Sequence, residues 1–273
     1  MRRTCELSPL VWRAVALSLA LAAAPSPATA QQDLAKAAQN PVAAMISVPF
    51  QNNTNFGYGP ESDVQNVLNI QPVWPLSLSP KWNVISRTIV PVLYQPDLVA
   101  SDGGTFGISD INETLFLSPA GAGKVIWGLG VTATFPTASD HRLGSEKWSA
   151  GPALVVLTMP GKWVLGFLTN NQWSYAGADS RADVNAFLLQ YFVNYNLQRG
   201  WYLTSSPINT AAWDADSEDR WTVPVGGGVG KIFKAGEQAL NAQAGVYFNA
   251  LKPDNLATSD WTLRLQLQLL FPK

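Results

Sequence analysis

The residues of this chain that could do catalytic chemistry gather around its single histidine. His141 stands in the segment TASDHRLGSEKW together with Ser139, Asp140 and Ser145. A serine activated by a histidine base is the arrangement that acyl hydrolases use, so hydrolysis is one function to weigh. That reaction needs a base and a nucleophile held rigidly, whereas this segment is a long polar connection between apolar stretches. A solvated loop histidine is therefore the better interpretation.

Other segments that resemble ligand sites lack the spacing that such sites need. One histidine, and one cysteine (Cys5) that belongs to the leader described below, argue against a zinc or iron site. The acidic stretch DADSEDR, residues 214–220, has oxygens suited to calcium but misses the D-x-D-x-D-G pattern. The glycine-rich stretch PVGGGVG, residues 224–230, is not followed by the Lys-Ser or Lys-Thr of a phosphate loop. We therefore expect no catalytic residue, no metal and no cofactor, and we expect these glycines to relieve crowding in a curved sheet.

Composition limits the class of protein. The 273 residues are 47% hydrophobic and only 14% charged, with 11 Trp and a net charge of −1. A disordered chain would have low hydrophobicity and high charge, and a nucleic-acid-binding domain would have a basic field. The sequence therefore indicates an ordered, very apolar protein with no nucleic-acid partner.

The first thirty residues have the pattern of a secretory signal peptide. Arg2, Arg3 and Arg13 supply positive charge, the apolar run AVALSLALAAA follows, and the small residues ATA precede Gln31. The apolar run is too short to anchor the chain across a bilayer. We expect a signal peptide at residues 1–30 with cleavage before Gln31, and then a short N-terminal segment, residues 31–41, with some helical character.

From residue 42 to 273, stretches of alternating apolar and polar residues recur. The predicted strands are Met45–Phe56, Val64–Leu76, Trp82–Tyr94, Phe106–Leu117, Val125–Pro136, Trp148–Thr158, Trp163–Tyr175, Val184–Asn196, Trp201–Trp213, Arg220–Phe233, Leu240–Leu251 and Trp261–Phe271. An even number of strands of this length, about twelve, suits a transmembrane barrel, and no room is left for crossover helices. We predict an all-β, up-and-down antiparallel barrel over residues 42–273.

The connections between the predicted strands alternate in length and charge. Short turns with one basic residue each, such as SPK and PGK, follow the even-numbered strands, and longer acidic connections such as SDHRLGSEK follow the odd-numbered ones. Long loops at one end and tight turns at the other are typical of outer-membrane barrels, with both termini on the periplasmic side. A soluble sandwich gives no reason for this segregation.

Tryptophans begin strands at both ends, as two interfacial girdles require. Trp82, Trp163 and Trp201 follow short turns, and Trp148, Trp221 and Trp261 follow long loops. Tryptophans at the ends of a soluble β-core are the alternative interpretation. The last strand, WTLRLQLQLLF, has leucines on one face and Arg264, Gln266 and Gln268 on the other. Lipid outside a water-holding interior explains such a strand.

Two features do not fit a regular barrel. Six prolines fall inside the strand pattern and should mark bulges or kinks because proline cannot donate to the ladder: Pro72, Pro91, Pro136, Pro152, Pro207 and Pro224. Glu113 falls beside Leu115 on the apolar face of its strand. Either a bulge near SDINE shifts the register, or the strand assignment there is wrong.

Strand parity places thirteen polar residues on the inner face. The predicted lumen-lining residues are Gln65, Asn69, Gln71, Asp110, Asn112, Asn170, Gln190, Asn194, Asn241, Gln243, Arg264, Gln266 and Gln268. Amides outnumber charges, which suits weakly polar neutral solutes better than an ion filter. The same amides could instead bond to one another across a closed, filled interior. The face of Arg87 stays open, because its strand neighbours Ile85 and Ile89 are apolar.

Four stretches resemble a known family of bacterial outer-membrane barrel proteins. They are QNVLNIQPVWPLSLSPKWNVISRTIVPVLYQP, GISDINETLFLSP, KWSAGPALVVLTMPGKWVLGFLTNNQWS and WTVPVGGGVGKIF. Members of that family are labelled transporters, "meta-pathway of phenol degradation" proteins or, misleadingly, neuromedin U. The resemblance implies an outer-membrane barrel that takes up small, hydrophobic or aromatic solutes, and it brings no catalytic motif.

The sequence thus favours a monomer-sized channel in the outer membrane of a Gram-negative cell, reached by secretion. Its expected partners are outer-membrane lipids, a small-molecule solute and the barrel-assembly machinery. Two alternatives stay open: an outer-membrane lipid hydrolase that uses His141, and a closed structural or surface-interaction barrel.

Overall fold

A computed structural model of the chain describes residues 27–98, 103–121, 123–254 and 258–272. Cys5 and most of the predicted signal peptide lie outside these residues. The described chain is all-β apart from one α-helix, α2 (Pro27–Ala38), and a short 3-10 helix, η1 (Gln198–Gly200). Within the described ranges, no helix has the length and apolar character needed to cross a membrane.

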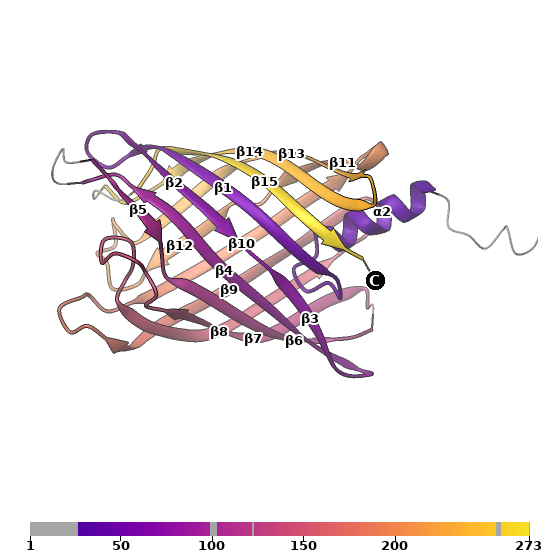
Figure 1. Ribbon diagram of the computed structural model, residues 1–273, viewed down its shortest axis with the longest axis horizontal. Coiled ribbons are helices and arrows are strands. Elements are labelled where there is room, and N and C mark those ends of the chain that lie inside the picture. The colour runs from indigo at the N-terminus through magenta and orange to yellow at the C-terminus, as the bar shows by residue number, and fades with distance from the viewer. Residues whose placement is uncertain (1–26, 99–102, 122, 255–257, 273) are drawn as a thin grey trace, which may run out of the picture.

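Fifteen strand segments form one closed antiparallel sheet (Figure 1). They are β1 (Ile46–Tyr58), β2 (Asp63–Ile70), β3 (Val73–Ser79), β4 (Trp82–Gln95), β5 (Thr105–Ile108), β6 (Ile111–Pro119), β7 (Val125–Phe135), β8 (Lys147–Thr158), β9 (Trp163–Gly177), β10 (Asn185–Asn196), β11 (Trp201–Ser205), β12 (Ile208–Ala212), β13 (Trp221–Ala235), β14 (Gln238–Leu251) and β15 (Trp261–Phe271). Sequence neighbours pair as antiparallel strands, and β15 returns to pair with β1 over its whole length. Three pairs of segments, β2 with β3, β5 with β6 and β11 with β12, each make one interrupted strand, so the barrel has twelve strands as predicted.

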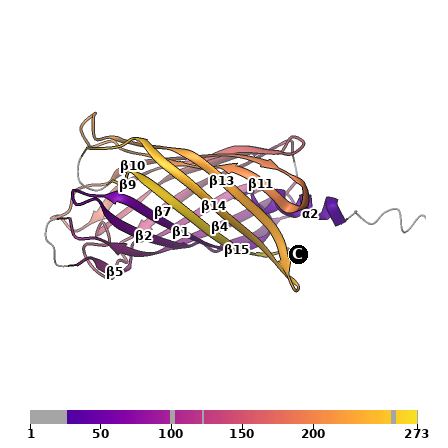
Figure 2. The ribbon, with the colours of Figure 1, turned by 90° about the horizontal axis from the view of Figure 1, so that it is seen from above.

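The barrel has two unlike ends. Figures 1 and 2 show helix α2 and the C-terminal residues at one end, together with the tight connections such as β3–β4 and β13–β14. The longer connections, such as β1–β2 and β7–β8, gather at the other end. We call these the turn end and the loop end. Strand direction alternates around a meander, so connections of odd and even strands must fall on opposite ends.

The prolines account for two of the three interruptions. Pro72 separates β2 from β3, and Pro207 separates β11 from β12. Proline has no N–H for the ladder, and the chain restores part of the pairing where the Thr88 N–H donates to the Pro72 carbonyl, at 3.1 Å. Pro224 lies at a register shift between β13 and β14, as expected for a bulge. Pro136 instead lies just beyond β7, whose last residue is Phe135.

The outer face is mainly apolar, and aromatic side chains lie on it near both ends. At the loop end, Phe56 and Trp261 stack with centroids 4.1 Å apart. At the turn end, Trp82 meets Trp127 edge-on at 5.9 Å. Leu265 and Leu267 lie exposed between these levels on β15, while their neighbours Arg264 and Gln268 are buried. This surface matches a lipid environment with two interfaces.

The turn-end half of the interior is packed with apolar side chains, which the sequence interpretation did not anticipate. One cluster holds Val42 from the N-terminal segment together with Ile85, Phe116, Val155 and others from the wall. A second cluster holds Ala35 and Met45 with wall residues, which are Tyr202, Ile232, Ala239 and Leu270. The N-terminal segment therefore enters the barrel and closes its turn end. Its helix begins at Pro27, four residues before the predicted cleavage site.

Glu113 lies on the outer face, and the chain does have an irregularity beside it. The strand is interrupted at Ser109 and Asp110, which separates β5 from β6. Before the interruption the even-numbered residues Phe106 and Ile108 point outward. After it the odd-numbered residues Leu115 and Leu117 do. Glu113 shares the outward parity of Leu115, so the interruption does not move it inward.

Candidate functional site: a polar passage through the barrel

The inward faces of neighbouring strands carry amide side chains at matching heights, because directly paired residues point to the same side of a sheet. Gln65 pairs with Asn55, and their side chains bond at 2.7 Å; Gln65 then donates to Gln95 at 2.7 Å. Asn241 pairs with Gln268 and donates to it at 3.0 Å. Runs of such bonds line the wall from strand to strand.

The structure places the thirteen residues predicted to line the lumen on the inner face or at its loop-end rim. Gln71, Gln190, Gln266 and Gln268 line a cavity near the turn end, and Arg264 lines one at mid-height. The others share the inward parity of these residues or bond to them: Gln65, Asn69, Asn112, Asn170, Asn194, Asn241 and Gln243. Asp110 stands at the rim, where it accepts hydrogen bonds from Ser145 and from the Ala138 N–H.

Three cavities follow one another down the interior, and strand β1 touches each of them in turn. The mouth cavity, about 430 Å³, reaches Tyr58 at the loop end of β1. The middle cavity, about 220 Å³, reaches Asn53 and Asn55. The lower cavity, about 140 Å³, reaches Gln51, Pro49 and Ser47. Together these cavities occupy successive levels of the interior between the loop end and the N-terminal segment.

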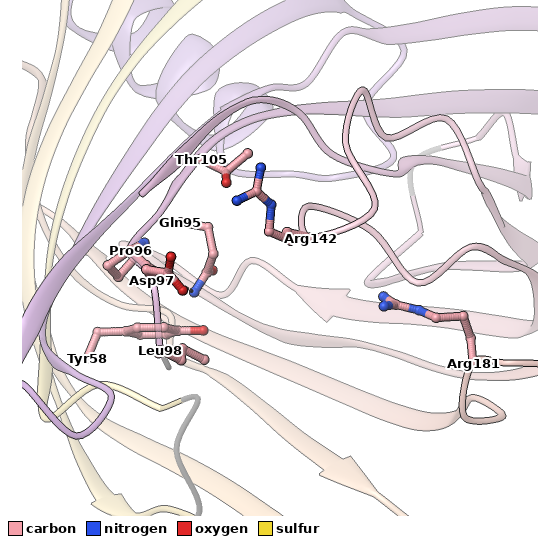
Figure 3. Close-up of a pocket in the computed structure, with 8 residues that line it drawn as sticks. All are labelled: Tyr58, Gln95, Pro96, Asp97, Leu98, Thr105, Arg142 and Arg181. Carbon is pink, nitrogen blue, oxygen red and sulfur yellow. Dashed lines mark hydrogen bonds between the residues drawn. The ribbon is translucent and has the colours of Figure 1, made fainter. Parts of the chain in front are cut away.

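The mouth cavity combines apolar, amide and charged side chains. Figure 3 shows Tyr58, Gln95, Pro96, Asp97 and Leu98 on one side, Thr105 and Arg142 above them, and Arg181 across the opening. The loop that supplies Arg142 lies against the inner face, because Ser139 and Leu143 occupy the space beside the inward-facing Gly107. Arg181 donates to the Ser145 carbonyl of this loop at 3.3 Å. A solute that enters from the loop end meets this mixed surface first.

An ion pair within one mouth loop fixes the orientation of Arg142. Arg142 donates to both carboxylate oxygens of Asp140, each at 3.0 Å. These hydrogen bonds hold the pKa of Asp140 well below its usual value, and the same contact raises the pKa of Arg142. Both groups are exposed, so solvent screens the pair and it contributes orientation more than stability.

The lower cavity is floored by the N-terminal segment. Residues Ala37 to Met45 contribute its floor, and Leu168, Val73 and Arg87 contribute part of its wall. The segment is tied to the wall by Gln39, which donates to Asn196 at 3.0 Å, and by the buried side chain of Val42. The sequence predicted neither this floor nor the inward position of Arg87.

One arginine faces each of the middle and lower cavities, and the two differ in how many of their donors are hydrogen-bonded. Arg264 donates to Asn53 at 2.8 Å and to the Ser206 carbonyl at 2.9 Å, and its guanidinium lies over the Tyr247 ring at 4.7 Å. Among the described residues, Arg87 donates one hydrogen bond, from Nη2 to Gln71 at 2.6 Å. Arg264 is thus bound into the wall, whereas most of the donors of Arg87 are left for the cavity.

The residues around His141 do not form a nucleophile–base pair. The His141 side chain is 67% exposed, and its Nδ1 lies 3.4 Å from Asp140. Ser139 bonds to the backbone of Ile108, and Ser145 bonds to Asp110. The described residues also contain no group of three or more His, Cys, Asp or Glu side chains placed to hold a metal ion.

The fold and the passage define a closed, twelve-stranded antiparallel barrel of the outer-membrane type. No protein-family model and no curated protein matches the chain. Among solved structures, the chain is similar to the COG4313 outer membrane channel from Pseudomonas putida F1, with a TM-score of 0.64 and 20% identity over 83% of this chain and 94% of that one.

Two further solved structures are less similar. The outer membrane phospholipase of Salmonella typhi has a TM-score of 0.42 and 13% identity over 84% of this chain and 90% of that one. A FadL homologue of Pseudomonas aeruginosa has a TM-score of 0.41 and 8% identity over 83% of this chain and 89% of that one. At these identities, the similarity to the COG4313 channel establishes barrel architecture and leaves the solute to be argued from the passage itself.

Proposed function

We propose that this protein is a channel of the Gram-negative outer membrane for passive uptake of small, hydrophobic or aromatic solutes. The observation that carries the proposal is the series of three cavities that leads from the loop end to the N-terminal segment. A purely structural barrel has no need of such a series of cavities in its interior. Support also comes from the similarity in fold to a protein named an outer membrane channel.

The outer surface supports this location. Exposed apolar residues between two aromatic levels would contact lipid acyl chains, and closure of the sheet leaves no edge unpaired in hydrocarbon. Secretion would follow from the signal peptide at residues 1–30, and insertion would use the barrel-assembly machinery. The loop end would then face outward, with the N-terminal segment on the periplasmic side.

In this proposal the N-terminal segment is a plug that moves to let solute leave. Only a few polar contacts tie it to the wall, among them Gln39 with Asn196 and a long contact, 3.5 Å, from Lys36 to the Met159 carbonyl. These bonds and the apolar packing of Ala35 and Val42 close the turn end, and the segment takes no part in the twelve-stranded ladder.

Single-channel conductance in planar bilayers tests the proposal. Residues 31–273 are compared with a chain that lacks residues 31–41, and correct folding is checked by heat-modifiable mobility in gels. The shortened chain is expected to conduct several-fold more, because most of the floor of the lower cavity, Ala37 to Pro41, is gone. Liposome swelling across sugars, amino acids and phenols then ranks the solutes.

A cross-link offers a matched control for the deletion. Gln39→Cys and Asn196→Cys together, bridged by a short bis-maleimide, should hold the segment in place and keep conductance low. The same double variant without the bis-maleimide has lost the Gln39–Asn196 hydrogen bond and should conduct at least as much as wild type. Absence of conductance in both the full and the shortened chain would favour a closed structural barrel. Lipid hydrolysis that disappears in His141→Ala would favour the hydrolase.

A further inference from the structure

The lower cavity contains an arginine whose donors are largely unused. Of the described residues that line this cavity, Arg87 alone carries a charge. A guanidinium has five N–H donors, and Arg87 has one hydrogen bond within the described chain, to Gln71. No described carboxylate forms an ion pair with it. The remaining donors therefore border the open space of the cavity.

The carboxylate that is nearest along the ladder does not neutralise Arg87 inside the barrel. Thr88 follows Arg87 and pairs with Glu113, but both of these residues point to the outer face. Glu113 is bonded there by Ser86 at 2.6 Å and by Thr88 at 2.5 Å. The sheet thus separates the negative charge from the cavity.

The middle cavity has the same sign of charge. Arg264 is the one charged residue among the described residues that line it, and its hydrogen bonds to Asn53 and Ser206 fix it in the wall. A solute that travels from the middle cavity to the lower cavity passes two positive side chains and no negative one. Rings of Arg or Lys favour anions in pores.

We propose that Arg87 binds the carboxylate of a small organic acid on its way through the barrel. This inference rests on the proposed channel function and narrows its small, hydrophobic or aromatic solutes to those that carry a carboxylate. A guanidinium presents paired donors that match the two oxygens of a carboxylate, and such bonds are stronger than neutral ones.

The rest of the cavity suits the body of such an acid. Val73, Leu168 and Met45 supply apolar surface, while Gln51 and Gln266 supply amides. The volume of about 140 Å³ excludes large solutes, since one water molecule takes about 30 Å³ of the liquid. An apolar body of about one ring with a carboxylate at one end fits this arrangement.

Arg87 has one structural role that must be separated from binding. Its bond to Gln71 spans the interruption at Pro72, where the Gln71 N–H already donates to the Pro49 carbonyl at 2.8 Å. Bracing of this interruption uses one donor of five. A purely structural arginine would therefore affect stability without discriminating between charged and neutral ligands.

Calorimetric titration of residues 31–273, folded in detergent micelles, tests the inference with benzoate and its neutral analogue benzamide. Wild type is expected to bind benzoate at least ten-fold more tightly than benzamide, with the difference shrinking as salt is raised. Arg87→Gln should abolish the difference, and Arg87→Lys should retain part of it. Arg199→Gln, which removes a charge from an exposed turn, should behave as wild type.

Equal affinity for benzoate and benzamide in wild type would overturn the inference, as would a preference that survives Arg87→Gln. The preference for benzoate could also persist in Arg87→Gln but disappear in Arg142→Gln or Arg181→Gln. That result would place the carboxylate site at the mouth cavity and would overturn the inference about Arg87. If Arg87→Gln does not fold, Arg87→Lys and the salt dependence decide. Conductance of the same samples tests the channel separately, because a conducting barrel without the preference contradicts this inference alone.

Discussion

Thr88 on β4 and Glu113 on β6 are direct cross-strand partners, and the Thr88 hydroxyl donates a hydrogen bond to the Glu113 carboxylate on the outer face of the barrel. The Ser86 hydroxyl donates to the other oxygen of the same carboxylate, Oε1, at 2.6 Å, so each carboxylate oxygen accepts one hydroxyl hydrogen bond. The neighbours of this group on the outer face, Leu115 and Trp74, are exposed and apolar. A carboxylate in such surroundings is stabilised by its two hydroxyl donors and destabilised by the surrounding lipid.

Replacement of Glu113 by leucine should therefore stabilise the barrel in a bilayer. Charged groups on the lipid face of a barrel are destabilising, and acidic ones less so than basic ones, so we expect a gain of about 1–2 kcal/mol. Urea-dependent folding into phospholipid vesicles measures this difference. Glu113→Gln keeps the hydrogen-bonding shape without the charge and should gain less. A loss of stability in Glu113→Leu would mean that the two hydroxyl bonds outweigh the cost of the charge.

Gly230 should not tolerate a side chain. A Cβ at Gly230 would lie 2.1 Å from Cζ of Tyr202, whose buried hydroxyl donates to Asn241 at 2.8 Å. Gly230→Ala must displace this ring or lose its hydrogen bond, and we expect a destabilisation of about 1–3 kcal/mol. Gly121→Ala is the matched control, because no atom lies within 4 Å of a Cβ there. Equal stability of the two variants in urea titrations would show that Tyr202 can move without cost.

The strands could be predicted from the sequence because their outward residues face lipid and are mostly apolar, whereas many inward residues are polar. Apolar and polar residues therefore alternate along each strand. Two interruptions had a local signal, since Pro72 and Pro207 remove a ladder donor. The third, at Ser109 and Asp110, has no proline. Glu113 on the apolar face was its signal and pointed to an irregularity near SDINE, which contains both residues, but the interruption does not turn Glu113 inward.

The position of Arg87 could not be predicted for a different reason. Its neighbour Ile85 is apolar, and parity arguments assign apolar residues to lipid. In the structure Ile85 is fully buried inside the barrel, because the turn-end half of the interior is an apolar core built around Val42. A helical pattern shows that the N-terminal segment has an apolar side, but only the folded chain shows which surface covers it.

The Lys147–Asp183 pair gives the loop end a defined response to acid. Lys147 Nζ lies 3.1 Å from Asp183, with side-chain exposures of 9% and 80%. Hydrogen bonds from Lys147 and Ser174 lower the pKa of Asp183. A lowered pKa in the folded state means that the stabilising contact is complete above the ordinary value of about 3.9 and is lost as the pH falls through the lowered value.

Carboxyl chemical shifts of Asp183, followed by NMR during an acid titration, should therefore move at a lower pH than those of an ordinary aspartate. In Lys147→Gln the midpoint should rise toward about 3.9, because the charged donor is gone. Ser174→Ala should shift the midpoint in the same direction by less. An unchanged midpoint in Lys147→Gln would show that Lys147 does not bond to Asp183 in solution.

Substitution of Val42 tests whether its apolar packing keeps the turn end closed. Its side chain is buried with Phe116 and Val155, and its N–H is turned toward Asn40 by a 3.0 Å hydrogen bond to that side chain. An aspartate at this position would be an unpaired charge in an apolar cluster, which costs several kcal/mol unless the segment leaves. Val42→Asp should therefore raise single-channel conductance while the barrel stays folded, because residue 42 precedes β1 and contributes nothing to the ladder. Ala44→Asp adds the same charge at an exposed position two residues later and should conduct as wild type does. If both variants conduct alike, contacts other than the Val42 anchor keep the turn end closed.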